Sequence, residues 1–256
     1  MKKNKNVFLI VLVSLVILMI VPSISAEATN NEHKNGGNVV DVPERSRLVD
    51  LGNGIMRYDQ VHYSTDNGWF DNNAITDPDG SINDYLLMGA KWRVAEPFVI
   101  NPTGYAENDM QSVIETSLNT WDNEVRKDIF GDVIVDVGVT YSDEIDSKNT
   151  VTFSGMTDDR VIAFASTWYT IRGRRIVESD VVFNTHFVWG DASIDADKMD
   201  LQNIATHEFG HSAGLLDLYR DEHSELTMFG ESDYDETNKR TLEAGDIAGI
   251  HAIYGV

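Results

Sequence analysis

The sequence contains no cysteine, few basic residues and, after its first 26 residues, no long apolar run. Without cysteine the chain forms no disulfide, and it lacks the residue that usually closes a structural zinc site. Asp and Glu number 42 against 20 Lys and Arg, for a net charge of −22, so nucleic acid is not an expected partner. We expect the acidic excess to form a solvated surface, with calcium or high external salt as alternative explanations.

Residues 1–26 have the composition of a secretory signal. Three lysines precede an apolar run, and the small residues Ser23 and Ala26 stand where a signal peptidase would cut. We therefore expect a signal peptide at 1–26 and a secreted, extracellular product without a membrane span after cleavage. A retained membrane anchor is the alternative, because the apolar run is long.

The stretch from residue 207 to residue 217 reads HExxHxxGxxD. On a helix, His207 and His211 are four residues apart, so both imidazoles face one side and can bind one zinc ion. Glu208 is rotated by about 100° from His207, which places its carboxylate beside the ion, where it can act on a water as a general base. Gly214 can end the helix in a left-handed turn, and the chain then brings Asp217 back as a third ligand.

Three protein ligands with one open position are typical of a catalytic zinc site, whereas a fourth residue closes a structural site. The alternative is a chance HExxH whose histidines lie on a solvated helix face. The added glycine, oxygen ligand and downstream methionine make that alternative the weaker one. His223, six residues after Asp217, is a rival third ligand outside the spacing of the motif.

These residues resemble the motif of the metzincin metalloendopeptidases and, within them, the matrixins, whose HExxHxxGxxH is followed by a methionine turn. Met228 is similar to the methionine of that turn, and residues 242–255 resemble the last matrixin helix. Lys91 and Trp92 resemble the start of the matrixin catalytic domain. The likeness covers residues from about 88 to 256, a normal size for one domain.

The resemblance implies an α+β fold, with a twisted mixed β-sheet, a zinc-binding active-site helix, a methionine turn and a C-terminal helix. It also implies a secreted zinc-dependent endopeptidase in which zinc and Glu208 activate water against a peptide carbonyl. The implied ligands of a single catalytic zinc ion are His207, His211 and Asp217.

Further roles follow from the same resemblance. Met228 would form an apolar floor beneath the metal ligands, and Asp246 would support its turn by hydrogen bonds. The substrate would lie extended, antiparallel to an edge strand that we place at 176–184. We expect a monomer that acts on proteins or peptides. A zinc hydrolase of small peptides or amides and a non-catalytic secreted binding protein are the alternatives, and the intact Glu208 counts against the second.

The chain departs from the matrixin pattern in several places. Asp217 stands where matrixins have histidine. Phe164 and Val182 replace the histidines of a second, structural zinc, so we expect only the catalytic one. Calcium is possible, although the run at 184–187 lacks the acids of the family's calcium site. Matrixins often hold a propeptide cysteine on the zinc, and a chain without cysteine cannot use that switch.

Two groups of acidic residues are further candidates for calcium. Their expected roles are turn formation for the first group and loop or helix N-terminal charge for the second, with calcium as the alternative. The groups are Asp77, Asp79 and Asp84, and Asp195, Asp197 and Asp200 before the metal helix.

We divide the chain into a signal peptide at 1–26, an N-terminal extension or propeptide at 27–87 and a matrixin-like catalytic domain at 88–256. Residues 39–87 alternate short apolar groups with turn signals, which indicates short strands or a propeptide wrapped over the domain. In the catalytic domain, residue patterns predict a strand at 91–101, a helix at 110–125, strands at 133–140, 161–169 and 176–188, and then the metal helix and the final helix.

Overall fold

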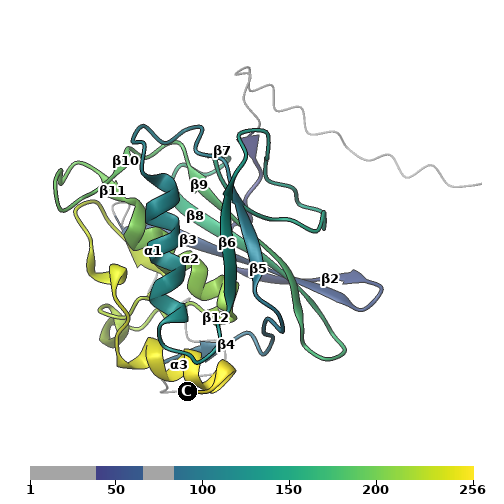
Figure 1. Ribbon diagram of the computed structural model, residues 1–256. Helices are drawn as coiled ribbons and strands as arrows, with labels where there is room; N and C mark the ends of the chain where they lie inside the picture. Colours follow the sequence, from purple (N-terminus) through teal and green to yellow (C-terminus); the bar gives the residue numbers. More distant parts are fainter. Residues whose placement is uncertain (1–38, 66–83) are drawn as a thin grey trace, which may run out of the picture. The chain divides into compact units, whose positions relative to one another are not determined.

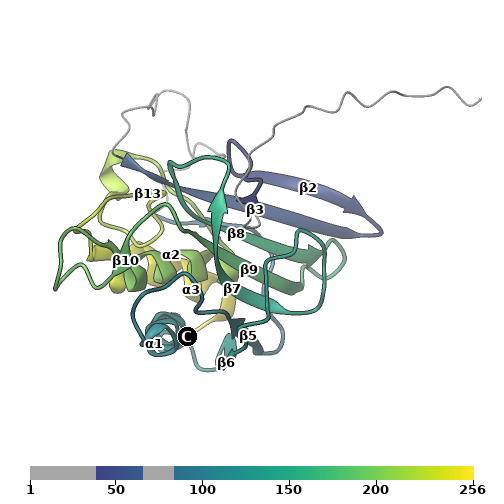
Figure 2. The same cartoon turned by 90° about the horizontal axis from the view of Figure 1, so that it is seen from above.

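The computed structural model describes residues 39–65 and 84–256, which belong to one compact unit. Its framework is a nine-stranded mixed sheet with the helices on one face (Figures 1 and 2). The predicted α+β class with a twisted mixed sheet is confirmed. The predicted signal peptide at 1–26 and the candidate residues Asp77 and Asp79 lie outside the described residues.

Most elements of the described chain are strands. In chain order they are β1 (Val39–Val40), β2 (Arg47–Gly52), β3 (Ile55–Ser64), β4 (Leu86–Leu87), β5 (Glu96–Ile100), β6 (Phe130–Val135), β7 (Asn149–Met156), β8 (Val161–Thr170), β9 (Ile176–Asn184), β10 (Trp189–Gly190), β11 (Met199–Asp200), β12 (Leu215–Leu216) and β13 (Glu231–Ser232). The helices are α1 (Met110–Asp122), α2 (Leu201–Ala213) and α3 (Ala244–Tyr254), and the 3-10 turns are η2 (Asp221–His223) and η3 (Asn238–Arg240).

The main sheet has the order β13-β3-β8-β9-β7-β5-β6. Strands β9, β7, β5 and β6 are parallel to their neighbours in this series, and β8 is antiparallel to β9. The prediction that the strand at 176–184 is a free edge of the sheet is therefore wrong. It pairs with β8 as a hairpin on one side and with β7 on the other, so both of its backbone edges are used.

Strand β7 is an element that the residue pattern did not predict. Its polar and small residues, among them Thr150, Thr152 and Gly155, hide the alternation that marked the other strands. It forms because β9 and β5 lie on either side of it and satisfy its backbone groups.

The N-terminal segment, residues 39–64, joins the sheet by three of its elements. Strand β1 pairs with β7, β2 forms a hairpin with β3, and β3 lies antiparallel along β8. In the view of Figure 2 the β2–β3 hairpin continues the sheet beyond β8. The region thus contains the expected short strands, β1 and β2, and also the ten-residue strand β3, which lies inside the sheet.

A second core forms on the sheet face away from the helices, where the N-terminal segment packs on the rest of the sheet. Phe164 and Val182, which replace the histidines of a second zinc site, pair across β8 and β9 in this core. Its members are Val40, Val42, Val61, Tyr63, Met156, Val161, Phe164 and Val182.

Helix α2 begins and ends at residues that the sequence marks. Asp200 caps its N-terminus, where the carboxylate accepts a hydrogen bond from the Asn203 amide at 2.8 Å, as expected for a helix N-terminal charge. Gly214 follows its last turn with φ of 108°, the predicted left-handed end. The indole of Trp121 donates to the Thr206 carbonyl at 2.8 Å and joins α1 to α2.

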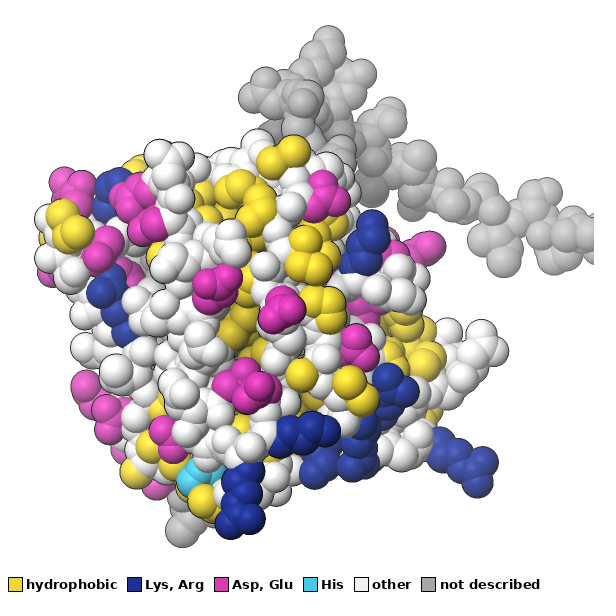
Figure 3. Space-filling model, in the orientation of Figure 1, with side chains coloured by type: hydrophobic (Ala, Val, Ile, Leu, Met, Phe, Trp, Pro, Cys, Tyr) yellow, Lys and Arg dark blue, Asp and Glu magenta, His cyan; other side chains and the backbone are white. Residues whose placement is uncertain are grey.

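The surface of the described residues is mixed in charge. On the face drawn in Figure 3, acidic side chains are spread among polar and apolar ones, while most Lys and Arg side chains gather toward the lower right. No helix in the ranges 39–65 and 84–256 is both long enough and apolar enough to cross a membrane.

Candidate metal centre

Helix α2 and the chain after it bring His207, His211 and Asp217 together. The Nε2 atoms of His207 and His211 lie 3.2 Å and 3.1 Å from Oδ1 of Asp217. Two atoms bound at 2.0–2.1 Å to a tetrahedral zinc ion lie about 3.3 Å apart, so the observed spacing is that of ligands around one ion.

The three converging atoms are buried and have no hydrogen-bond partner. The other ring nitrogens are engaged: Nδ1 of His207 lies 2.7 Å from the Thr227 carbonyl, and Nδ1 of His211 lies 3.1 Å from the Leu215 carbonyl. A ring that donates from Nδ1 to a carbonyl presents a bare Nε2 lone pair. Because buried polar atoms without partners are uncommon, this group fits a divalent metal ion, and its two nitrogens and one oxygen suit zinc.

The turn after α2 positions Asp217. After Gly214, strand β12 pairs with β4 and leads the chain back toward the helix. The second carboxylate oxygen of Asp217 accepts hydrogen bonds from the hydroxyls of Tyr219 at 3.1 Å and Ser46 at 3.4 Å. These bonds leave Oδ1 directed at the two imidazoles.

The charges of the group suit metal binding. Burial acts to raise the pKa of Asp217, but the adjacent His211 and His207 outweigh it and hold the pKa below its usual range. Burial lowers the pKa of His207 to about 4. Burial acts to lower the pKa of His211, but the Asp217 carboxylate outweighs it and holds the pKa above its usual value. Asp217 and His207 therefore present an ionised carboxylate and a neutral imidazole, the forms that bind metal, and His211 would release its proton when a metal ion binds.

Glu208 lies beside this group with no exposed surface, and neither of its carboxylate oxygens has a hydrogen-bond partner. Burial raises its pKa to about 8. A carboxylate with a pKa in this range holds and releases a proton near neutral pH, which is the property of a general acid–base group.

Two residues of β3, His62 and Gln60, lie in the metal centre, and the sequence analysis had not predicted either of them there. The ring of His62 lies edge-on to that of His207, with centroids 4.0 Å apart, and its Nδ1 is 4.0 Å from Oε1 of Glu208. The side-chain amide of Gln60 lies against Nδ1 of His211 and donates to the Leu215 carbonyl at 3.1 Å. Period-two alternation along β3 places the two on one face, but it could not tell which face meets α2.

The remaining candidates lie elsewhere. Within the described ranges, two groups of His, Asp and Glu could hold an ion, namely His207 with His211 and Asp217, and His62 with His207 and Glu208. The rival ligand His223 belongs to neither, and its Nε2 lies 3.5 Å from the Asp84 carboxylate. The acidic candidates for calcium that the structure describes also belong to neither group, which leaves calcium unsupported.

The methionine turn lies beneath α2, where Met228 is buried. A Cβ atom at Gly210 would collide with the sulfur of Met228 and come within 2.8 Å of Trp121, so the glycine permits close contact. The Asp246 carboxylate accepts hydrogen bonds from the amides of Thr227 at 2.9 Å and Met228 at 3.1 Å. The predicted support of this turn by Asp246 is confirmed.

Met228→Leu is expected to keep the metal and to lower the free energy of unfolding by about 1.5 kcal/mol or less, because the two side chains have similar volumes. The reason is that the sulfur of Met228 lies against Gly210 of α2, while the metal group is formed by His207, His211 and Asp217. Zinc content by atomic absorption and urea unfolding measure the two effects. Complete loss of zinc would contradict a packing role.

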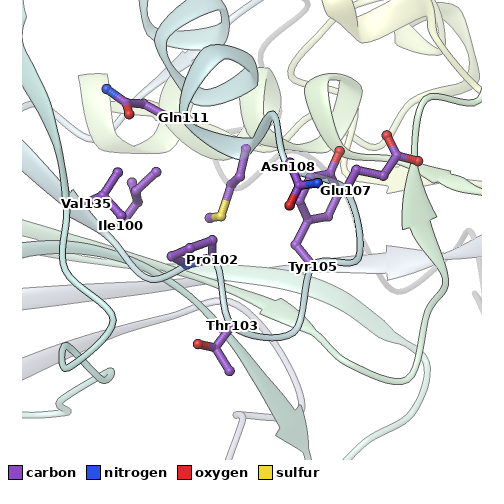
Figure 4. Close-up of a pocket in the computed structure, with 9 residues that line it drawn as sticks. Ile100, Pro102, Thr103, Tyr105, Glu107, Asn108, Gln111 and Val135 are labelled. Atoms are coloured by element: carbon purple, nitrogen blue, oxygen red, sulfur yellow. The ribbon is translucent and has the colours of Figure 1, made fainter.

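A separate hollow lies at the connection from β5 to α1 (Figure 4). It shares no residue with the metal group, and its one acidic lining residue, Glu107, pairs with Lys198 at 3.2 Å. The lining residues are Ile100, Pro102, Thr103, Tyr105, Glu107, Asn108, Met110, Gln111 and Val135.

Comparison with known protein families matches residues 92–255 to the family described as Matrixin. The matched range contains α1, α2, the methionine turn and α3, and it begins after the N-terminal segment. A search of curated proteins found no match.

Proposed function

This chain belongs to the matrixin family of metallopeptidases, and from that premise we propose that it is a secreted zinc-dependent endopeptidase that hydrolyses peptide bonds in proteins. One observation carries the proposal. Three buried ligand atoms without hydrogen-bond partners, from His207, His211 and Asp217, converge beside Glu208. This buried glutamate lies on α2, the helix that carries the two histidines. The signal-like composition of residues 1–26 supports secretion.

His207, His211 and Asp217 would hold the zinc ion. When bound there, zinc would supply Lewis-acid polarisation of a peptide carbonyl and stabilise the negative charge that develops on its oxygen. The Thr227 and Leu215 carbonyls orient the two imidazoles through their Nδ1 atoms, and Tyr219 orients the Asp217 carboxylate. Such fixed partners keep the ligand atoms in place without reorganisation during the reaction.

Glu208 would transfer the protons of the reaction. Its carboxylate would take a proton from the attacking water and pass it to the leaving amine nitrogen. Burial favours the protonated form of Glu208, so the group holds the proton between these two steps and releases it to a more basic amine. General acid–base transfer of this kind contributes about 10²–10⁴-fold to rates.

The proposal is tested by removing the metal. The purified protein is incubated for several hours with an unfolded protein and, in parallel, with dipeptides, and the cut bonds are identified by mass spectrometry. We expect cleavage within the protein, loss of cleavage with a zinc chelator, and recovery when zinc is restored. Cleavage that persists without zinc, or that is confined to dipeptides, would contradict a zinc endopeptidase.

A further inference from the structure

Four arginines gather at the connection between β8 and β9, in a chain whose net charge is −22. Arg172, Arg174 and Arg175 belong to the connection itself. Arg93, which precedes β5, donates from Nη2 to the Gly173 carbonyl at 3.1 Å. All four residues are exposed, and together we call them the arginine surface. In Figure 1 the connection projects at the lower right of the sheet, the side on which Lys and Arg gather in Figure 3.

The arginine surface has no acidic partner within the ranges 39–65 and 84–256. The neighbouring β2–β3 hairpin carries Asp50, but its Oδ1 accepts the Gly52 amide at 2.9 Å. Acids elsewhere on the molecule are largely screened beyond about 8 Å at physiological ionic strength, so this surface acts locally as a cationic site. The arginines that do pair with carboxylates in these ranges are Arg47, Arg57, Arg160, Arg220 and Arg240.

Hydrogen bonds hold the backbone of this connection in place. The hydroxyl of Thr170 donates to the Arg172 carbonyl at 3.0 Å and accepts from the Arg175 amide at 3.3 Å. The Thr170 amide donates to the Arg175 carbonyl at 2.9 Å. Gly173 and Arg174 turn the chain with φ of 89° and 48°. The guanidinium groups therefore extend from an ordered backbone, which lowers the entropic cost of binding a ligand.

Exposed apolar side chains accompany the arginine surface. Ile171, in the same connection, is 47% exposed, and Val94, next to Arg93, is 55% exposed. The Ile171 amide donates to the Gly54 carbonyl at 2.8 Å, which brings the end of the β2–β3 hairpin alongside. That hairpin carries Leu51, which is 42% exposed. Single exposed apolar residues are common, but a group of them among four cations forms a mixed apolar and cationic surface.

We propose that the arginine surface attaches the chain peripherally to membranes that contain anionic lipids. Guanidinium groups match phosphate oxygens with pairs of hydrogen bonds, and adjacent apolar side chains enter the boundary between headgroups and acyl chains. An anionic lipid surface provides both kinds of contact at once. The inference goes beyond peptide hydrolysis and does not depend on the metal centre.

The geometry of this region favours a lipid surface over an acidic polypeptide. An extended peptide binds along an open strand edge or in a groove. Both edges of β9 are used by β8 and β7, and β8 lies between β9 and β3. The hollow at the β5–α1 connection shares no residue with the arginine surface. An acidic polypeptide would also leave Ile171 and Val94 in water, whereas a lipid surface buries them.

Binding is measured by co-sedimentation with vesicles of phosphatidylcholine, either alone or mixed with phosphatidylglycerol. The chain from residue 27 onward is used, because the apolar run of residues 1–26 would itself enter lipid and the described compact unit lies after it. We expect binding to the mixed vesicles that weakens as salt is raised, and little binding to the neutral ones. Equal binding to both kinds of vesicle, or binding to neither, would overturn the proposal.

Charge variants locate the binding. Arg172→Ser with Arg174→Ser should weaken binding to mixed vesicles about thirtyfold, since each cationic side chain near an anionic surface contributes about fivefold. Arg172→Lys with Arg174→Lys keeps the charge and should bind within a few fold of the parent. The matched control is Arg45→Ser with Lys198→Ser, which removes the same charge before β2 and from the pair with Glu107. An equal loss in the control or in the lysine variant would contradict a site at the arginine surface.

The apolar contribution and the rival ligand are tested in the same assay. Ile171→Ser should weaken binding several-fold, whereas Ile194→Ser should not, although Ile194 is 84% exposed in the loop before α2. Circular dichroism of each variant checks that the fold is kept. Polyglutamate stands for an acidic polypeptide. Its capture by the parent chain, with no binding to mixed vesicles, would assign the arginine surface to a polypeptide and overturn membrane attachment.

Discussion

Replacing Glu208 by alanine lowers the rate of peptide cleavage by a factor on the order of a hundred or more, while zinc content and fold stay those of the parent. The glutamate offers the proton acceptor of the reaction and lies outside the group formed by His207, His211 and Asp217. Its buried oxygens make no hydrogen bond, so removing them breaks none. The metal group therefore survives a substitution that removes the base.

Cleavage rate, zinc content and circular dichroism are compared for Glu208→Ala, Glu208→Gln and the parent. Glu225→Ala is the control, since that glutamate is exposed and outside the metal group, and we expect it to behave as the parent. Turnover by Glu208→Ala at the parental rate would show that another group transfers the proton.

Asp217→Ala weakens zinc binding by orders of magnitude. The carboxylate is the one acidic member of the group, and its Oδ1 is the atom that both Nε2 atoms face. Without it, His207 and His211 alone provide two neutral ligands. Loss of a hydrogen-bonding partner behind a ligand costs about 10–100-fold in metal affinity, and loss of a ligand itself costs more.

Zinc affinity is measured by competition with a chromophoric chelator. His223→Ala is the matched control, because this histidine is buried near the same turn but outside the metal group, and it should bind zinc as the parent does. The reverse pattern, with tight zinc binding by Asp217→Ala and none by His223→Ala, would show that His223 is the third ligand.

The sequence determined the parts of the site that depend on short-range geometry. Four-residue spacing on a helix places His207 and His211 on one face, whatever the rest of the chain does. Gly214 then ends the helix in a left-handed turn, and Asp217, three residues later, lies beside His211. The resemblance to a family predicted that Asp246 supports the turn at Met228 by hydrogen bonds, and the structure shows such a bond from the Met228 amide.

Only the tertiary structure decided which strands are neighbours and what lies over the metal group. Gln60 and His211 are 151 positions apart, and no local pattern relates them. Alternation in β3 separates its two faces, but the choice between them depends on pairing with β8. Pairing with β8 on one side and with β7 on the other removes the free edge that the sequence had suggested at β9. Helical neighbours are set by backbone geometry over a few residues, whereas strand neighbours are set by the packing of the whole sheet. The position of His62 beside His207 and Glu208 therefore emerged only from the fold.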